Sequence, residues 1–194
     1  MFGTPRAADV ETLLAQLRQR PEVESAQRLN EFEVSAGDAD AKVNATADPY
    51  LDLQHYFVTL ELGQAHRWSR GDGIDVSIID TGADFEHPEL RGRIAFRQDF
   101  VGSEDDDFSA DVHGTAVAGV IGAESDNGVG MIGVAPSARL SVLKACWHRP
   151  DRARAVCNTF TLAKALDYAL DSGPDIINLS LNGPSDPLLG RLVA

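Results

Sequence analysis

A series of short apolar strands separated by helical segments is the pattern that most constrains the fold. From residue 50 onward, apolar runs of strand length alternate with segments in which apolar side chains recur at helical spacing. The strand candidates are 76–79, 94–100, 140–145 and 176–181, and the helix candidates between them are 113–123 and 158–171. Strands that are apolar throughout and alternate with helices are typical of a parallel sheet covered on both faces. The sequence therefore predicts an α/β fold with three α/β/α layers and a mostly parallel sheet.

The chain before this region divides into smaller parts. Residues 9–20 have the apolar spacing of a helix, residues 32–34 resemble a strand, and residues 52–66 have the spacing of one further helix. Residues 35–49 lack periodicity and large apolar side chains, which indicates a linker. The predicted organisation is an N-terminal unit of residues 1–34, a linker of 35–49 and a main domain of 50–194.

Composition limits the partners. The 194 residues include 43% hydrophobic and 24% charged side chains, as in ordinary globular proteins. The formal net charge of −13 repels phosphate backbones and anionic lipid, so we expect no nucleic acid and no membrane surface as partners. A cation such as calcium fits better, and the acidic residues 104–107 are either a cation-attracting or a solvated loop. No apolar run approaches the roughly 18 residues of a membrane span, and residues 1–9 do not resemble a signal peptide.

The two cysteines, Cys146 and Cys157, are close enough in sequence to close a small loop. A disulfide between them would indicate an exported protein, whereas two buried thiols are the alternative.

Three stretches carry side chains suited to chemistry. Asp80 ends an apolar strand and is followed by Thr-Gly, and reactive groups gather at the carboxyl ends of parallel strands. His113 precedes a helical segment of tiny residues, where the helix dipole favours the neutral imidazole of a general base; a structural role is equally open. The strand end at Ser180 to Gly183 is either a site for adding a peptide strand or an ordinary strand with a turn.

Together with residues 130–136, these stretches resemble the subtilisin-like serine proteases, or subtilases. In that family an Asp-Thr-Gly strand end carries the Asp of the catalytic triad, and a His-Gly-Thr helix start carries the His. The resemblance implies that His113 takes a proton from a serine hydroxyl while Asp80 orients and stabilises the imidazole. It implies a polypeptide substrate, a secreted or periplasmic location, and no cofactor for catalysis. The substrate-binding residues implied are Ser180, Leu181, Asn182 and Gly183.

The resemblance extends to two further features. The family's calcium loop resembles residues 124–130, with Asn127 as a ligand helped by Glu89 and Gln54, so a structural calcium ion and a plain surface loop are the two interpretations. Subtilases also commonly carry a propeptide that ends in a helix and a strand, and residues 1–34 resemble the end of one.

The chain departs from the family pattern in what it lacks. The family nucleophile lies in a Gly-Thr-Ser-x-Ala stretch, and no Gly-Thr-Ser occurs here. Ser185 is instead expected to cap the following helix. Asn182 replaces a Gly of the pattern, and its side chain would either narrow the pocket or alter its preference. Residues 188–194 begin an apolar helical face without a polar finish, which favours a domain truncated at its C-terminus, with the missing half as a candidate partner. We expect the chain alone to be inactive as a peptidase.

Three other functions are alternatives to a subtilase. A non-catalytic module that binds a peptide or a protease is the main alternative. An aspartic protease needs two Asp-Thr-Gly stretches or a dimer in a β-rich fold, and an actin-like ATPase needs a second carboxylate and glycine-rich phosphate loops. The main interpretation predicts Asp80 and His113 in contact at one end of the sheet.

Overall fold

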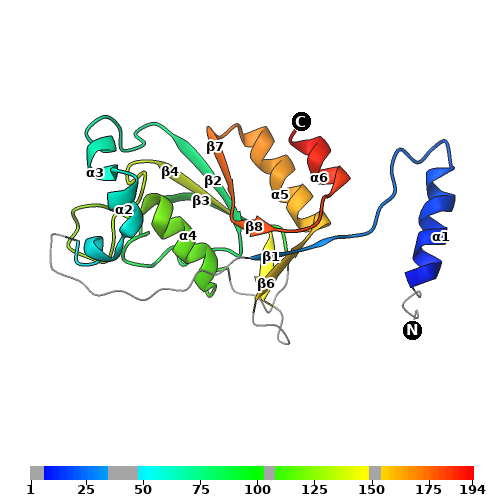
Figure 1. Ribbon diagram of the computed structural model, residues 1–194, viewed down its shortest axis with the longest axis horizontal. Coiled ribbons are helices and arrows are strands. Elements are labelled where there is room, and N and C mark those ends of the chain that lie inside the picture. The colour runs from blue at the N-terminus through cyan, green and yellow to red at the C-terminus, as the bar shows by residue number, and fades with distance from the viewer. Residues whose placement is uncertain (1–6, 35–47, 103–107, 149–153) are drawn as a thin grey trace.

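A parallel sheet forms the centre of the computed structural model, which describes residues 7–34, 48–102, 108–148 and 154–194. Its strands lie in the order β3-β4-β2-β7, and each neighbouring pair is parallel (Figure 1). They are β2 (Asp75–Asp80), β3 (Ile94–Asp99), β4 (Arg139–Lys144) and β7 (Ile176–Leu179). Each of the four strands begins within one residue of a predicted one, and β7 ends before its predicted end.

Helices cover both faces of this sheet. Successive residues of a strand point to opposite faces, so Ile78 belongs to the apolar cluster that includes Ala118 of α4 (Val112–Gly122). Its neighbour Ile79 belongs to the cluster that includes Leu162 of α5 (Thr159–Ser172). This arrangement confirms the predicted α/β fold with three layers.

A second, antiparallel sheet was not predicted. Its order is β5-β6-β1-β8, so β1 of the N-terminal unit lies between two strands of the main domain (Figure 1). The strands are β1 (Glu31–Val34), β5 (Cys146–His148), β6 (Ala155–Asn158) and β8 (Leu181–Asn182). The expected single strand over 176–181 is therefore wrong, because β7 ends at Leu179 and the chain then enters this other sheet.

The predicted helix over 52–66 is also wrong in detail. The segment forms three short helices, interrupted at Glu61, whose φ of 52° lies in the left-handed region. They are η1 (Leu51–Leu53), α2 (His55–Thr59) and α3 (Leu62–Ala65). At the N-terminus, α1 (Ala7–Arg18) lies away from the two sheets (Figure 1).

The last helix, α6 (Pro187–Leu192), is capped by a different residue from the one expected. The carboxylate of Asp186 accepts hydrogen bonds from the backbone N–H groups of Leu188 and Leu189. Asp186 is therefore the N-cap in place of Ser185, and Pro187 occupies the first helical position, where its missing N–H costs nothing.

Cys146 and Cys157 form a disulfide between β5 and β6, so the alternative of two buried thiols is excluded. Closing a loop of this size contributes about 3 kcal/mol in the chain-entropy model. Within the described residues, no helix has the length and apolar character needed to cross a membrane. The predicted linker, apart from residues 48 and 49, and the acidic stretch 104–107 lie outside the described residues.

Candidate active site

Asp80 and His113 meet at the carboxyl end of β2. The Asp80 side chain is almost fully buried, and its Oδ1 atom lies 2.8 Å from Nδ1 of His113. Oδ1 also accepts the backbone N–H of Thr81 at 2.7 Å, which holds the carboxylate against its own turn. Because an ionised carboxylate only accepts hydrogen bonds, the contact directs the Nδ1–H tautomer and leaves Nε2 able to take a proton.

The second oxygen of Asp80, Oδ2, is buried and has no hydrogen-bond partner among the described residues. A buried carboxylate oxygen without a donor is uncommon in proteins and calls for an explanation in terms of function or an unseen donor. The unpaired Oδ2 atom leaves negative charge on Asp80, which an imidazolium ring at His113 would stabilise.

The start of α4 fixes the position of His113. Asp111 is the N-cap, and its Oδ1 accepts the backbone N–H of His113 at 3.0 Å. The next residue, Gly114, donates its N–H to Oγ1 of Thr81 at 3.1 Å, so the helix start is bonded directly to the turn after Asp80. A Cβ atom on Gly114 would overlap the carbonyl oxygen of Gly82. The glycine therefore allows the close approach that brings the two side chains together.

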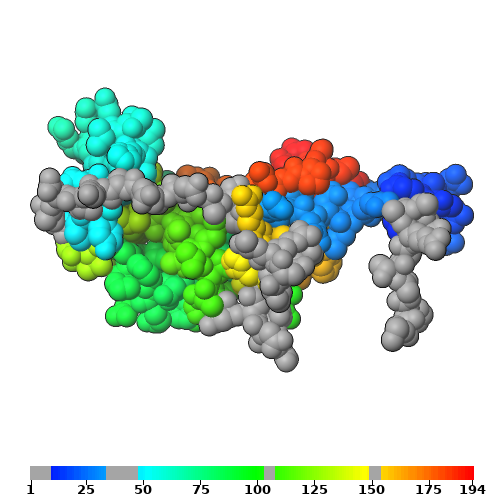
Figure 2. Space-filling view, turned by 60° about the horizontal axis from the view of Figure 1, so that its bottom comes forward, coloured from blue at the N-terminus to red at the C-terminus, as the bar shows by residue number. Residues whose placement is uncertain are grey.

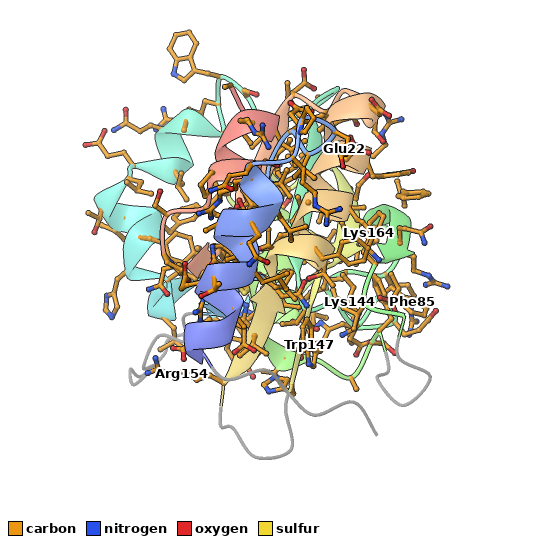
Figure 3. The ribbon with its side chains drawn as sticks, turned by 90° about the vertical axis from the view of Figure 1, so that its right-hand side faces the viewer. Glu22, Phe85, Lys144, Trp147, Arg154 and Lys164 are labelled. Carbon is orange, nitrogen blue, oxygen red and sulfur yellow. A yellow bond between two sulfur atoms is a disulfide. The ribbon has the colours of Figure 1, made fainter. Side chains whose placement is uncertain are left out.

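Two residues that the sequence reasoning missed support this arrangement. Lys144, which is labelled in Figure 3, is fully buried in β4, in register with Asp80. Its ammonium group donates to the carbonyl oxygen of Thr81. His148 of β5 lies with Nε2 3.1 Å from Oδ2 of Asp111 and so ties the disulfide-closed hairpin to the cap of α4. A lysine at the end of a buried strand was a usable signal for the first; nothing local indicated the second.

Residues Ser180 to Gly183 lie beside β1, the strand from the N-terminal unit. β1 pairs antiparallel with β8, with Glu33 opposite Asn182, and on its other edge with β6. The ring of Phe32 lies where a Cβ on Gly183 would be, so the glycine leaves space for a large side chain. Ser180 is off the strand and accepts a hydrogen bond from Asn178 at 3.0 Å. This arrangement holds an extended peptide between two strands, which is the β-addition mode of recognition.

Comparison with known proteins decides the family. The family model described as the subtilase family matches residues 71–192, which is more than half of the chain and includes Asp80, His113 and β8. The chain belongs to the subtilase family. Its three-layer architecture is the one expected for this family.

Individual subtilases match over shorter shares of their length. A thermophilic serine proteinase from Bacillus sp. (strain AK1) is 39% identical over 109 residues, covering 56% of this chain and 26% of the relative. Thermitase from Thermoactinomyces vulgaris is 32% identical over 138 residues, covering 70% of this chain and 47% of the relative. The major intracellular serine protease of Bacillus subtilis (strain 168) is 37% identical over 121 residues, covering 60% of this chain and 36% of the relative. The chain thus spans about a quarter to half the length of these relatives.

The expected calcium residues of this subtilase are partly brought together. Glu89 is buried, and its carboxylate accepts the backbone N–H of Met131 at 2.8 Å and the side-chain amide of Asn127 at 3.4 Å. Gln54 binds the next residue of the same loop, because its amide makes two hydrogen bonds, of 2.7 and 2.8 Å, to the backbone of Ile132. Burial raises the pKa of Glu89, and the negative charge of Asp48 raises it further, whereas the two hydrogen bonds lower it.

Asp48 is the residue of this loop that the sequence reasoning missed. It is buried, and its carboxylate accepts the backbone N–H groups of Asp126, Asn127 and Gly128 at 2.7 to 3.1 Å. Carboxylate and amide oxygens suit calcium, so Asp48, Glu89, Asn127 and Gln54 all fit the ion in type. No three His, Cys, Asp or Glu side chains form a metal-binding group in the described part of the chain.

Proposed function

We propose that residues 50–194 are the N-terminal part of a subtilase serine endopeptidase domain, with Asp80 and His113 as two members of its catalytic triad. The observation that carries this proposal is the 2.8 Å contact between Asp80 Oδ1 and His113 Nδ1 at a parallel strand end. The subtilase relatives support the same reaction, because their names describe serine proteinases.

In the proposed mechanism, Nε2 of His113 takes the proton of a serine hydroxyl as the oxygen attacks the peptide carbonyl. Asp80 stays ionised, holds the ring in the Nδ1–H tautomer and stabilises the imidazolium that forms. His113 then gives the proton to the leaving amine. The chain contains no Gly-Thr-Ser, so we propose that the nucleophile and the oxyanion Asn come from a further C-terminal part of the protein, which is then a partner of this chain.

The peptide site supports a polypeptide substrate. We infer that substrate would lie between β6 and β8, where β1 lies now, with Leu181, Asn182 and Gly183 facing its backbone and Ser180 at the adjacent strand end. Residues 1–34 then act as a propeptide remnant whose strand fills the substrate site, followed by a linker over 35–49. A non-catalytic peptide-binding module is the second candidate function, and this same strand pairing favours it.

The open edge of β7 supports the proposed partner. Among the described strands, β7 pairs with β2 alone, so its other edge presents unpaired backbone groups. A strand from the C-terminal part would satisfy them. The disulfide and a cell wall-associated protease among the relatives support a secreted or periplasmic location, although other relatives are named as intracellular.

A fluorophosphonate probe, which labels activated serines, tests the proposed function. The 194-residue chain is expected to remain unlabelled, because it lacks the nucleophile. The protein extended through a downstream Gly-Thr-Ser is expected to be labelled and to hydrolyse peptides. Labelling of the 194-residue chain would contradict its predicted inactivity. An extended, folded protein that binds peptides and takes no label would favour the non-catalytic module.

Calcium binding is a separate proposal. We expect calcium to bind through Asp48, Glu89 and Asn127, where it would offset the negative charge of two buried carboxylates. At one hundred times the dissociation constant it would contribute about 2.7 kcal/mol and raise the melting temperature by about 5–10 °C. Glu89→Gln should abolish the rise, because it removes one of the two carboxylates from the site. A melting temperature that responds no more to calcium than to sodium at equal ionic strength would refute the proposal.

A further inference from the structure

Asp186 links the N-terminal segment to two helices of the main domain. Beyond capping α6, its carboxylate accepts hydrogen bonds from the side-chain amides of Gln27 at 2.9 Å and Asn30 at 2.8 Å. It also accepts the hydroxyl of Thr159, the first residue of α5, at 2.6 Å. The residue is only 9% exposed, so these contacts are shielded from water. One buried carboxylate therefore receives five donors from three segments.

The two amides reach Asp186 because the segment before β1 already follows the strand direction. Asn30 exchanges two hydrogen bonds with Thr159: its backbone N–H donates to the hydroxyl at 2.8 Å, and its carbonyl accepts the backbone N–H at 2.8 Å. Side chains two residues apart in a strand point to the same face. Asn30 and Phe32 accordingly face the same side, where Asp186 receives the amide and the apolar cluster with Leu189 receives the ring.

The contact surface continues beyond the strand pairing. Arg191 of α6 donates to the hydroxyl of Ser25 at 3.0 Å and lies 3.5 Å from the carboxylate of Glu24. In Figure 2 the blue N-terminal segment lies directly against the red residues of α6. The segment is therefore bound along its length by α6 as well as at its end by β6 and β8.

We propose that Asp186 is a docking residue for side-chain amides, which extends the peptide site past the strand pairing and selects a segment with an amide two residues before its buried aromatic side chain. In this chain the occupant is its own segment 27–34. This inference rests on the proposed function only in assuming that β6 and β8 form a peptide site.

The chemistry at this position favours side chains that donate hydrogen bonds, such as amides, over acidic ones. An ionised carboxylate accepts hydrogen bonds and donates none, so it pairs with NH₂ groups and repels a second carboxylate. Burial by itself would raise the pKa of Asp186, but the hydrogen bonds from Thr159, Gln27, Leu189 and Asn30 together lower it to about 2. Asp186 is therefore an acceptor throughout the neutral pH range.

Backbone hydrogen exchange of residues 31–34 in the full chain tests the proposal. Asn30→Asp places two carboxylates together and should speed exchange of these amides about tenfold or more, because a buried charge-assisted contact is lost. Asp186→Asn should act in the same direction while still capping α6, since Asn is an equally good N-cap. The double variant restores an amide facing a carboxylate and should bring exchange back toward that of the unaltered chain.

The controls separate docking from folding. Asp175→Asn is a matched change at the other end of the sheet, where the carboxylate accepts the backbone N–H of Asp75, and should leave exchange at 31–34 unchanged. Exchange of β2 and β4 amides should stay the same in every variant. The proposal is overturned if Asn30→Asp leaves exchange at 31–34 unaltered, or if the double variant exchanges no more slowly than Asn30→Asp. Neither result bears on catalysis, which this measurement does not use.

Discussion

Replacing His113 with alanine is expected to lower kcat/KM for peptide hydrolysis about 10⁴-fold or more in the protein extended through its nucleophilic serine. The imidazole is the group that Asp80 orients and the proposed acceptor of the serine proton. Without it the hydroxyl is not activated, and the binding site alone supplies the remaining rate. Steady-state hydrolysis of a fluorogenic peptide gives the value, and KM should change little because His113 is assigned no binding role.

Two further variants, one at Asp80 and one at an exposed histidine, accompany this experiment. Asp80→Asn should cost about 10⁴-fold in kcat as well, because an amide facing Nδ1 favours the wrong tautomer. His55→Ala, an exposed histidine at the start of α2, should leave kcat/KM within about twofold, since surface changes away from the site have small effects. A His113→Ala protein that keeps a tenth of the activity would refute the assignment of His113 as the base.

Replacing Gly114 with alanine should destabilise the fold by about 3 kcal/mol, which corresponds to a fall in melting temperature of about 6–12 °C. The added methyl would overlap the backbone carbonyl of Gly82, and neither segment can move freely. Gly114 lies in the first turn of α4 and donates its N–H to Thr81 in the turn after Asp80, and Gly82 holds a φ of 103° in that turn. Relief of the overlap would also move His113 away from Asp80.

Gly190→Ala is the matched control for this experiment. Gly190 lies in α6, and nothing comes within 4 Å of a Cβ atom built on it. The substitution should be neutral or stabilise the protein by up to about 1 kcal/mol, because alanine is the better helix former. A Gly114→Ala melting temperature equal to that of Gly190→Ala would contradict the close approach of α4 to the turn.

Much of the parallel sheet and its helices followed from the sequence. The strands before Asp80 and Lys144 are apolar except for one serine in each, so their burial on both faces is visible in a single run of residues. The helix over 159–172 shows both its apolar face and its stop at Gly173, which adopts a φ of 64°. Such elements are encoded by residues that are neighbours in the chain.

The second sheet was harder to predict. The break between β7 and β8 at Ser180 has no local signal, because β8 exists through its pairing with β1, about 150 residues earlier. The same holds for Asp186, which resembles an ordinary cap until Gln27 and Asn30 reach it from the N-terminal unit. Gln54 was assigned to an ion site from the family pattern alone. In the structure it is hydrogen-bonded to Ile132, next to the Met131 that binds Glu89, and its role as a ligand stays a prediction.

By itself, the sequence determined the layered α/β architecture, because its strands and helices are defined by local periodicity. The pairing of Asp80 with His113 was predicted from the resemblance to the subtilases. The tertiary structure alone decided that β1 lies between β6 and β8, that Asp186 holds this segment, and how Lys144 and Asp111 support Asp80 and His113. The physical reason is that strand pairing and buried hydrogen bonds join residues far apart in the chain, and such contacts leave no periodic trace in either partner.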